Sequence, residues 1–282
     1  MGLNTPDDSA ILELKSITKG FLPPRLTYAQ IQEIVDPVEG LIAYCTDCSP
    51  KTIYLYNGAY WCNIINYSTA QVTDKDGFPY GTVISNKTSK TWLDRNLGAS
   101  QIAITYNDAK AYGSLYQWGR AKDGHEKRDS EESDDLLTFP TQESYKFIKK
   151  TETRTDEIWI DASAFSGFNF FWETGSNGED GENNPCPDGY RVPTNVELDQ
   201  EFIGFDIFQN SWDTYDLKLP ATGYRHGSTG IVGGLDSGYY WSSSIDNENK
   251  KKAYVRYFGT TEESYSYPAS QGRGYSIRCI KK

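Results

Sequence analysis

The stretch "GFLPPRLTYAQIQEIVDPVEGLIAYCTD", residues 20–47, decides the fold of the first part of this 282-residue chain. The paired prolines at 23–24 force an extended backbone, because the residue before a proline is driven out of the helical region. Thr27 is a good N-cap for a helix over residues 28–35, and Gln30 stands at the capping-box position. The stretch therefore predicts an extended segment that leads directly into a short helix.

The residues on either side predict a strand–helix–hairpin module over residues 1–66. "ILEL" (11–14) is typical of a short strand, and "LIAYCT" (41–46) and "TIYLYNG" (52–58) are strands separated by a polar turn. A unit of this size has a thin core and would gain stability from oligomerisation or docking. We therefore expect it to mediate attachment or self-association, with a trimer favoured. The predicted helix has one apolar face, formed by Ile31, Ile34 and Val35.

The rest of the chain predicts a polar linker over 67–76 and a second domain over 77–282. Short strands alternate there with Gly- and Asn-rich turns. Helices are expected over 107–118 and after Thr194, where Glu197 completes a capping box. Aromatic residues make up 14% of the chain, with 21 Tyr and 7 Trp, which favours β structure and also suits a binding surface. We predict an α+β fold of antiparallel strands with two helices, preceded by the N-terminal module.

The charge distribution excludes several classes of partner. The net charge is −11 and no basic cluster is present, so we expect no nucleic-acid partner. No apolar run approaches the roughly 18 residues of a membrane helix, so we expect no membrane insertion. The start, "MGLNTPDDSAILELKS", has neither a basic region nor an apolar core of the signal-peptide type.

Five cysteines leave at least one unpaired within a monomer. Cys45 and Cys48 form a Cys-x-x-Cys pair that, together with Cys62, would make three quarters of a zinc site. Free or partly oxidised thiols are the favoured alternative, because a closed zinc site needs a fourth ligand and both histidines lie far away in the sequence. We expect no cofactor, although the acidic loop over 175–184 could supply several of the oxygen ligands that calcium needs.

The sequence carries no nucleophile elbow, phosphate loop or zincin motif, so we do not expect an enzyme. His125 lies in the charged stretch 123–135, which predicts a solvated loop, and His226 lies on a Gly-rich turn. Acidic pairs such as Asp156/Glu157 and Glu179/Asp180 are common by chance in a chain with 39 acidic residues.

Several conspicuous side chains have ordinary structural explanations. Their apolar surroundings place three tryptophans in the core, and pairing to carboxylates or carbonyls explains three arginines better than anion binding does. These residues are Trp92, Trp118 and Trp241, and Arg95, Arg120 and Arg191.

The first module resembles a unit that recurs in Bacteroidetes surface proteins and in the tail proteins of their phages. The matching pieces are "GLNTPDDSAILELKSITKGFLPPRLT" (2–27), "GLIAYCTD" (40–47) and "YNGAYW" (56–61). The resemblance implies an attachment or assembly unit. Because no leader precedes the module, we expect a virion protein made in the host cytoplasm; a truncated cellular protein would begin in the same way.

Residues 71–282 resemble the Fibrobacter succinogenes major paralogous domain. The resemblance implies a C-type-lectin-like fold, in which the N- and C-terminal strands meet, and a disulfide between Cys186 and Cys279. The stretch 123–135 is then an insertion at a permissive position. The matching pieces are "TWLDRNLGA" (91–99), "GSLYQWGRAKDG" (113–124), "NNPCPDGYRVPTNVEL" (183–198), "LPATGYR" (219–225), "YYWSSS" (239–244) and "YSIRCIK" (275–281).

Together these features favour a fibre-like phage tail protein that binds a host cell-surface glycan or protein and contacts other tail proteins through residues 1–66. It would be located in the virion tail. The alternatives are a bacterial surface or fimbrial-tip adhesin and a purely structural virion component. We expect the ligand at polar, Tyr-bearing loops between the last strands and at the neighbouring Gly-rich turn. The candidates are Tyr224, His226, Asp246, Asn247, Asn249, Tyr265, Tyr267 and Arg273.

Overall fold

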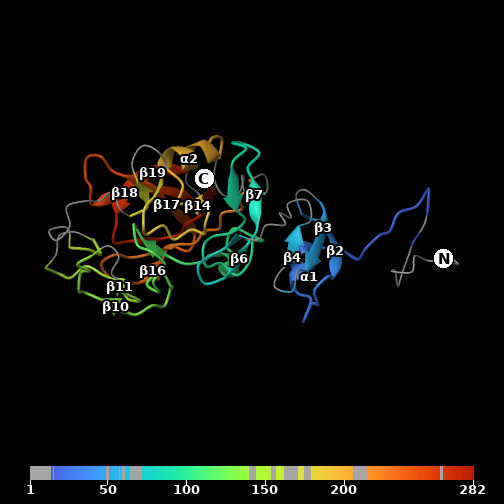
Figure 1. Ribbon diagram of the computed structural model, residues 1–282, viewed down its shortest axis with the longest axis horizontal. Coiled ribbons are helices and arrows are strands. Elements are labelled where there is room, and N and C mark those ends of the chain that lie inside the picture. The colour runs from blue at the N-terminus through green and yellow to red at the C-terminus, as the bar shows by residue number, and fades with distance from the viewer. Residues whose placement is uncertain are drawn as a thin grey trace. The chain divides into compact units, whose positions relative to one another are not determined.

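The chain divides into two compact units, Met1–Tyr67 and Ser68–Lys282 (Figure 1). The fold is mostly β, with several antiparallel sheets and short helices. Within the part of the chain that is described, no helix is both long enough and apolar enough to cross a membrane. The computed structural model describes residues 14, 16–48, 51–56, 58, 61–63, 72–139, 144–153, 157–161, 171–174, 179–205, 215–260 and 263–282.

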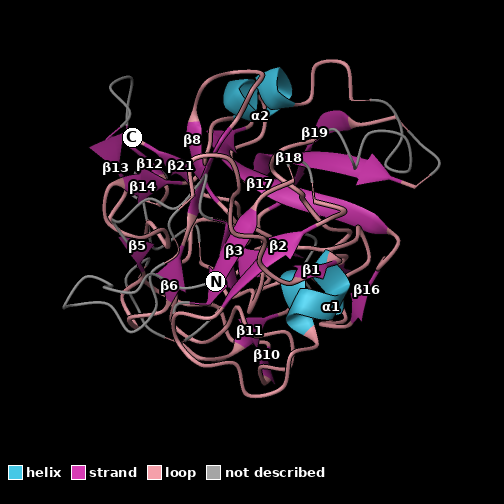
Figure 2. Ribbon diagram, turned by 90° about the vertical axis from the view of Figure 1, so that its right-hand side faces the viewer, coloured by secondary structure: helices cyan, strands magenta, loops and turns pink. Residues whose placement is uncertain are grey.

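The first unit is a four-stranded sheet in the order β1-β2-β3-β4 with one helix, α1 (Figure 2). Strand β1 is parallel to β2, and the other neighbours are antiparallel. The predicted capping box is confirmed: the Gln30 amide donates to Thr27 Oγ1 (3.2 Å) and the Thr27 amide donates to Gln30 Oε1 (2.9 Å). The elements are β1 (Arg25–Leu26), α1 (Tyr28–Gln32), β2 (Ile42–Cys45), β3 (Ile53–Tyr56) and β4 (Trp61–Asn63).

The helix is shorter than its sequence pattern predicts. It ends at Gln32, and Val35 is 84% exposed rather than part of the apolar face. Asp36 adopts a positive φ of 47°, which a helix cannot contain, and a proline follows it. Only Leu14 of the strand expected over 11–14 lies within the described residues. The core of this unit is correspondingly small: Ile31, Ala43, Cys45, Tyr54 and Trp61.

Cys45 and Cys48 are joined by a disulfide. Of the two expected states, free thiols are wrong for this pair, and partial oxidation of the three N-terminal cysteines agrees with the bond. Zinc binds cysteine as a thiolate, and neither sulfur of a disulfide is one. The side chain of Cys62 lies outside the described residues.

The second unit contains six sheets within its described residues. The first has the order β14-β21-β8-β7, with bounds Tyr190–Arg191, Ile280–Lys281, Thr91–Leu93 and Thr82–Ile84. The second has the order β16-β15-β20-β9, with bounds Val232–Gly233, Tyr224–Arg225, Gly274–Tyr275 and Tyr116–Gln117. The third is β17 (Ser237–Ile245), β18 (Lys252–Gly259) and β19 (Tyr265–Ser270). The remaining pairs are β5 (Val72–Thr73) with β6 (Pro79–Tyr80), β10 (Glu132–Ser133) with β11 (Phe147–Ile148), and β12 (Glu173–Thr174) with β13 (Glu179–Asp180).

The three-stranded sheet separates two hydrophobic clusters. Side chains alternate between its faces, so that Trp241 and Val255 belong to one cluster and Tyr240 and Phe258 to the other. Helix α2 (Asn195–Glu201) packs against β17, β18 and β19. Its predicted cap is confirmed, because the side chains and amides of Thr194 and Glu197 bond reciprocally.

Buried tryptophans link this core to distant parts of the backbone. The three predicted core tryptophans are wholly buried. The Trp118 indole donates to Ser242 O (2.8 Å) and the Trp241 indole donates to Tyr116 O (2.8 Å), so two segments far apart in the sequence are fixed to each other. Trp159 and Trp172 also donate to backbone carbonyls, those of Trp118 and Arg120. Large apolar rings are thereby buried with no indole N–H lost.

The helix expected over 107–118 is not formed. A single 3-10 turn, Ala109–Ala111, is followed by Gly113 and then by β9. Gly113 has φ +70°, and a Cβ on it would lie 2.4 Å from Leu97 O, so this position requires glycine. The run from Leu115 to Trp118 is buried on all sides, and a short buried run cannot be told from a helix by its hydrophobic pattern alone.

A disulfide joins Cys186 to Cys279, two buried residues separated by 93 positions. Strand β21 follows Cys279 directly and lies between β14 and β8. The bond therefore fixes the end of the described chain to its middle.

The Cys186–Cys279 bond closes a long loop, so its removal should destabilise the second unit strongly. We expect the double variant Cys186→Ser/Cys279→Ser to lose about 4 kcal/mol of unfolding free energy in the chain-entropy account. Urea unfolding followed by tryptophan fluorescence measures this loss. The matched control, Cys45→Ser/Cys48→Ser, removes a bond that closes only a short loop in the other unit. Equal urea midpoints for the wild type and the Cys186/Cys279 variant would contradict this expectation.

Candidate functional site

Tyrosines from three neighbouring strands line up on one face of the β17-β18-β19 sheet. Tyr239 is paired with Tyr257, and Tyr257 with Tyr265, so the three stand directly opposite one another. Their ring centroids are 5.2 and 5.0 Å apart. Tyr224 extends the line beyond Tyr239 (5.0 Å), and Tyr267 extends it beyond Tyr265 (5.7 Å). We call these five residues the tyrosine row.

The tyrosine row is partly buried and partly open to solvent. Tyr265 is 49% exposed, Tyr257 is nearly buried at 9%, and the other three are half-buried. A phenol is neutral at physiological pH, and burial raises the pKa of Tyr239 and of Tyr267 still further above the ordinary value. A neutral phenol both donates and accepts hydrogen bonds. The row therefore offers aromatic surface and hydroxyl groups along one line.

Charged and polar side chains adjoin the tyrosine row. Arg273 Nε donates to Glu157 Oε2 (2.8 Å), and Glu157 Oε1 lies 4.0 Å from His226 Nδ1. The rings of His226 and Tyr224 are 6.2 Å apart. The Ser228 amide donates to His226 Nδ1 (3.2 Å), so in the neutral ring the proton is on Nε2. Arg273 and Glu157 are thus paired, with His226 close by, and the three lie beside the row at Tyr224.

The structure brings five of the eight predicted ligand residues together: Tyr224, His226, Tyr265, Tyr267 and Arg273. Two of these were expected in a loop, but Tyr265 and Tyr267 belong to strand β19. Their Tyr-Ser-Tyr alternation is the period of a strand, and the polar residues around them concealed it. Arg273 lies in the turn between β19 and β20.

The other three predicted residues lie apart from the tyrosine row, in a turn whose Lys250 and Lys251 carbonyls accept hydrogen bonds from Gln271 (2.9 and 3.2 Å), two residues before Arg273. They occupy the turn after Ile245, six positions along β17 from Tyr239, which is roughly 20 Å at the rise of a strand. Asp246 is 7% exposed, and its Oδ1 accepts the Glu248 amide (3.1 Å), so it builds the turn and is not an exposed ligand group. Asn247 and Asn249 are exposed, but Asn249 Oδ1 accepts the Lys251 amide (3.1 Å).

Sequence reasoning missed three members of the site. Tyr239 and Tyr257 look like core residues, because large apolar side chains follow them directly in "YYW" and "RYF". The usable signal was the alternation of side chains along each strand. It puts Tyr239 on the same face as Trp241 and on the opposite face from Tyr240, so Tyr239 belongs to a different face from its direct neighbour. Glu157 was considered only as half of a glycosidase pair. Its partner Asp156 lies outside the described residues, and Glu157 is instead paired with Arg273.

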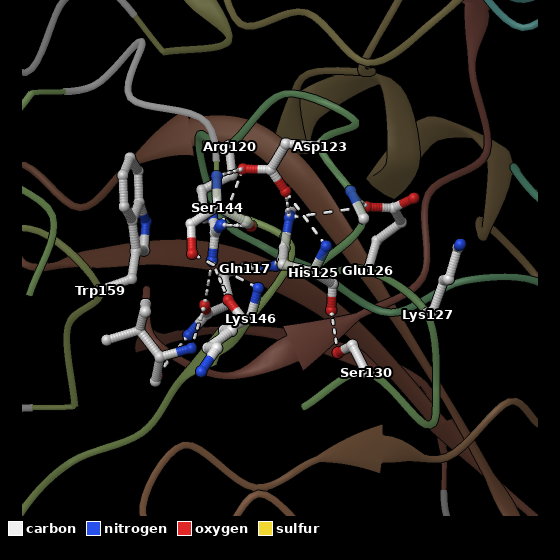
Figure 3. A network of polar contacts seen from close by, with 12 residues as sticks. Gln117, Arg120, Asp123, His125, Glu126, Lys127, Ser130, Ser144, Lys146 and Trp159 are labelled. Carbon is white, nitrogen blue, oxygen red and sulfur yellow. Dashed lines mark hydrogen bonds and ion pairs between the residues drawn. The ribbon is translucent and has the colours of Figure 1, made fainter. Parts of the chain in front are cut away.

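A second polar cluster is buried within the unit, around Asp123, His125 and Glu126 (Figure 3). His125 was expected on a solvated loop, but it is 0% exposed. The backbone N–H of Gln117 donates to His125 Nε2 (3.1 Å). The ring proton is therefore on Nδ1, which donates to Asp123 Oδ1. Both ring nitrogens are occupied, so this histidine offers no lone pair to a metal.

Arg120 links the buried cluster to the surrounding loops. Its guanidinium donates to Asp123 Oδ2 (2.7 Å), Gln117 Oε1 (2.8 Å) and the carbonyls of Ser144 and Lys146 (2.6 and 3.1 Å). The predicted structural role of the arginines is confirmed here, and also at Arg95 and Arg191, which pair with Asp94 and Glu197. The cluster is a structural network that holds the segment after Arg120 against the core, which explains why this charged stretch is not a free loop.

Residues 1–116 match a family described as a phage tail like trimerisation region. The matched region contains the whole first unit and continues to β9 of the second. No curated protein and no solved structure matches the chain. The match indicates a phage-tail-like structural protein, and a trimerisation region implies a homotrimer, the state favoured from the small size of the N-terminal module.

The buried His125 should make stability depend on pH. Burial, with the charge of Arg120, lowers its pKa to about 4, against roughly 6.5 in an unfolded chain. Between these values only the unfolded state takes up the proton. The contribution of His125 to stability is therefore constant above about pH 6.5 and falls by up to about 1.4 kcal/mol per pH unit as the pH drops towards 4. Urea midpoints measured from pH 7.5 to 4.5 test this.

Two variants isolate the contribution of His125. His125→Gln should flatten the pH dependence between pH 6.5 and 4.5, whatever its effect on stability at neutral pH. His226→Gln removes the other histidine, which lies at the surface, and should retain the wild-type slope. If the His125 variant keeps that slope, another group is responsible.

Proposed function

We propose that this protein is a trimeric, fibre-like component of a phage tail whose second unit binds a host cell-surface glycan through the tyrosine row. The observation that carries the proposal is the row itself, together with the polar group formed by Arg273, Glu157 and His226 beside it. The match over residues 1–116 to a phage tail like trimerisation region supports the tail assignment. We further propose that the protein is located in the virion tail, contacts other tail proteins through its first unit, and is not an enzyme.

The chemistry of the tyrosine row suits a sugar chain. Aromatic rings provide large, rigid contact area at a low cost in conformational entropy. Phenol hydroxyls, a guanidinium, a carboxylate and an imidazole can donate to or accept from the hydroxyl groups of a sugar. Because the row extends over rings from β15 to β19, it matches an extended oligosaccharide better than a single residue.

Trimerisation would strengthen a weak site of this kind. A shallow, half-exposed surface binds one glycan chain weakly, because little of the ligand is buried. Three copies that face one cell surface convert the second and third contacts into intramolecular events, which raises the overall avidity by roughly 10²–10⁴. The proposed function therefore needs both units: the first to form the trimer and the second to bind the glycan.

We also propose that the second unit has a C-type-lectin-like fold. Two observations support this proposal. Strand β21 pairs with β8, near the start of the unit, as the meeting of the N- and C-terminal strands in that fold requires. The Cys186–Cys279 disulfide corresponds to the bond that the resemblance to the major paralogous domain implied.

A purely structural virion protein is the second candidate, and the trimerisation match alone favours it equally. A surface or fimbrial-tip adhesin would use the same site and differs only in location. A glycan array that includes bacterial capsular polysaccharides separates binding from non-binding candidates. If the wild-type trimer binds no glycan and no cell surface, the purely structural candidate is the better one.

Substitution of the most exposed part of the site should weaken binding and leave the fold intact. Tyr265 is 49% exposed and the His226 side chain 33%, so Tyr265→Ala/His226→Ala should weaken glycan binding by about tenfold or more with little change in melting temperature. Tyr267 and Arg273 are avoided, because Tyr267 packs on the core and Arg273 is paired. The control Tyr145→Ala removes a tyrosine that is 61% exposed and outside the row. Unchanged binding by the double variant would place the receptor surface elsewhere.

A further inference from the structure

Large apolar side chains are exposed on the first unit. We call five of them the apolar end: Phe21 (61% exposed), Leu22 (71%), Val35 (84%), Val38 (69%) and Leu41 (36%). Nearby Ile17 is fully exposed. The core of the same unit holds only five buried residues. A unit this small that leaves as many large apolar groups outside as it buries is poorly stabilised as a monomer.

The chain topology gathers these residues at one end of the sheet. Strands β1 and β2 are parallel with Arg25 opposite Tyr44, and the Tyr44 amide donates to Pro24 O (2.8 Å), so the segments that carry Leu22 and Leu41 enter the sheet from the same end. Phe21 adjoins Leu22 in the chain, and the Leu41 amide donates to Val38 O (3.1 Å).

Val35, the remaining member of the apolar end, lies at the same end of the sheet because the chain returns there after α1. In a parallel strand–helix–strand unit, the helix runs back towards the start of both strands. The chain that leaves α1 at Gln32 therefore returns to the start of β2 by way of Val35 and Val38. The topology thus places all five residues of the apolar end where β1 and β2 begin.

Exposed charges of both signs border this patch in the sequence. Lys19 and Arg25 precede or follow its first members, and three acidic residues alternate with the later ones: Glu33, Asp36 and Glu39. A closed threefold ring is built from head-to-tail contacts, in which one surface of a copy meets a different surface of the next. Opposite charges at the two ends of such a contact favour one register.

We propose that the apolar end is the surface through which two further copies of this chain pack in the trimer. The occupant follows from the match, because the whole first unit lies within the phage tail like trimerisation region. The inference rests on the proposed trimer and goes beyond it by naming the side chains that hold it. Val35 and Val38 are the most informative positions, since neither contributes to the core of its own unit.

The test is the mass of the full-length protein by sedimentation velocity at micromolar concentration. The wild type is expected to be a trimer, and Val35→Asp/Val38→Asp a folded monomer, since desolvated charges at a hot spot weaken association by roughly 30-fold or more. The control Ile231→Asp alters a residue of the second unit that is 68% exposed, and it should remain trimeric. Should the Asp variant fail to fold, Val35→Ser/Val38→Ser makes the same test with a smaller perturbation.

The outcomes separate this inference from the proposed trimer. A monomeric wild type would overturn the trimer itself. A trimeric double variant of lower melting temperature would mean that another segment of the same protomer covers the patch. A trimeric double variant of unchanged stability would mean that a different tail protein binds the patch. Either trimeric result overturns the proposal and keeps the trimer.

Discussion

The second unit depends on the burial of tryptophan rings whose N–H groups are all satisfied. Trp118, Trp159, Trp172 and Trp241 lie in one cluster, and each donates to a backbone carbonyl. The rings supply the apolar area that a loop-rich chain with very short strands otherwise lacks. The hydrogen bonds decide which loop lies against which strand. A core of aliphatic residues would bury similar area without fixing these connections.

The tyrosine row is a consequence of the same arrangement. Tyr239 and Trp241 share one face of β17, so the residues that continue the face beyond the core are aromatic as well. Tyr224, Tyr239 and Tyr267 pack on the cluster while staying partly exposed, and Tyr265 is 49% exposed. A surface built on paired strands is stiffer than one built on loops, because each ring is held by its cross-strand neighbours.

Much of the fold could be predicted where the signal is local. The capping boxes at Thr27 and Thr194 need only a four-residue pattern, and both are present. The predictions failed where distant residues decide. His125 is surrounded by charges in the sequence and was therefore expected in solvent, but Gln117 and Arg120 bury it through a network that the sequence does not display. The run after Gly113 has helical apolarity because it is buried on all sides.

Only part of the candidate site could be predicted, because here too some features are local and others depend on distant residues. Composition was enough to single out Tyr265 and Tyr267, since tyrosines amid serines stand out. It could not place them on a strand opposite Tyr257, because pairing register is a property of two segments. Asp246 shows the opposite error: a polar residue in a turn was expected to face a ligand, but it serves the turn.

The position of β21 has a consequence for biosynthesis. This strand lies between β14 and β8, so the sheet cannot close until a segment far downstream of β8 has left the ribosome. Contacts of such large sequence separation form slowly. The first unit, in contrast, pairs only strands that are neighbours in the sequence, so all of its pairing partners are available as soon as β4 emerges. Nascent chains translated side by side would therefore be able to associate through their first units while the second units are still incomplete, which would raise the local concentration of partners before folding ends.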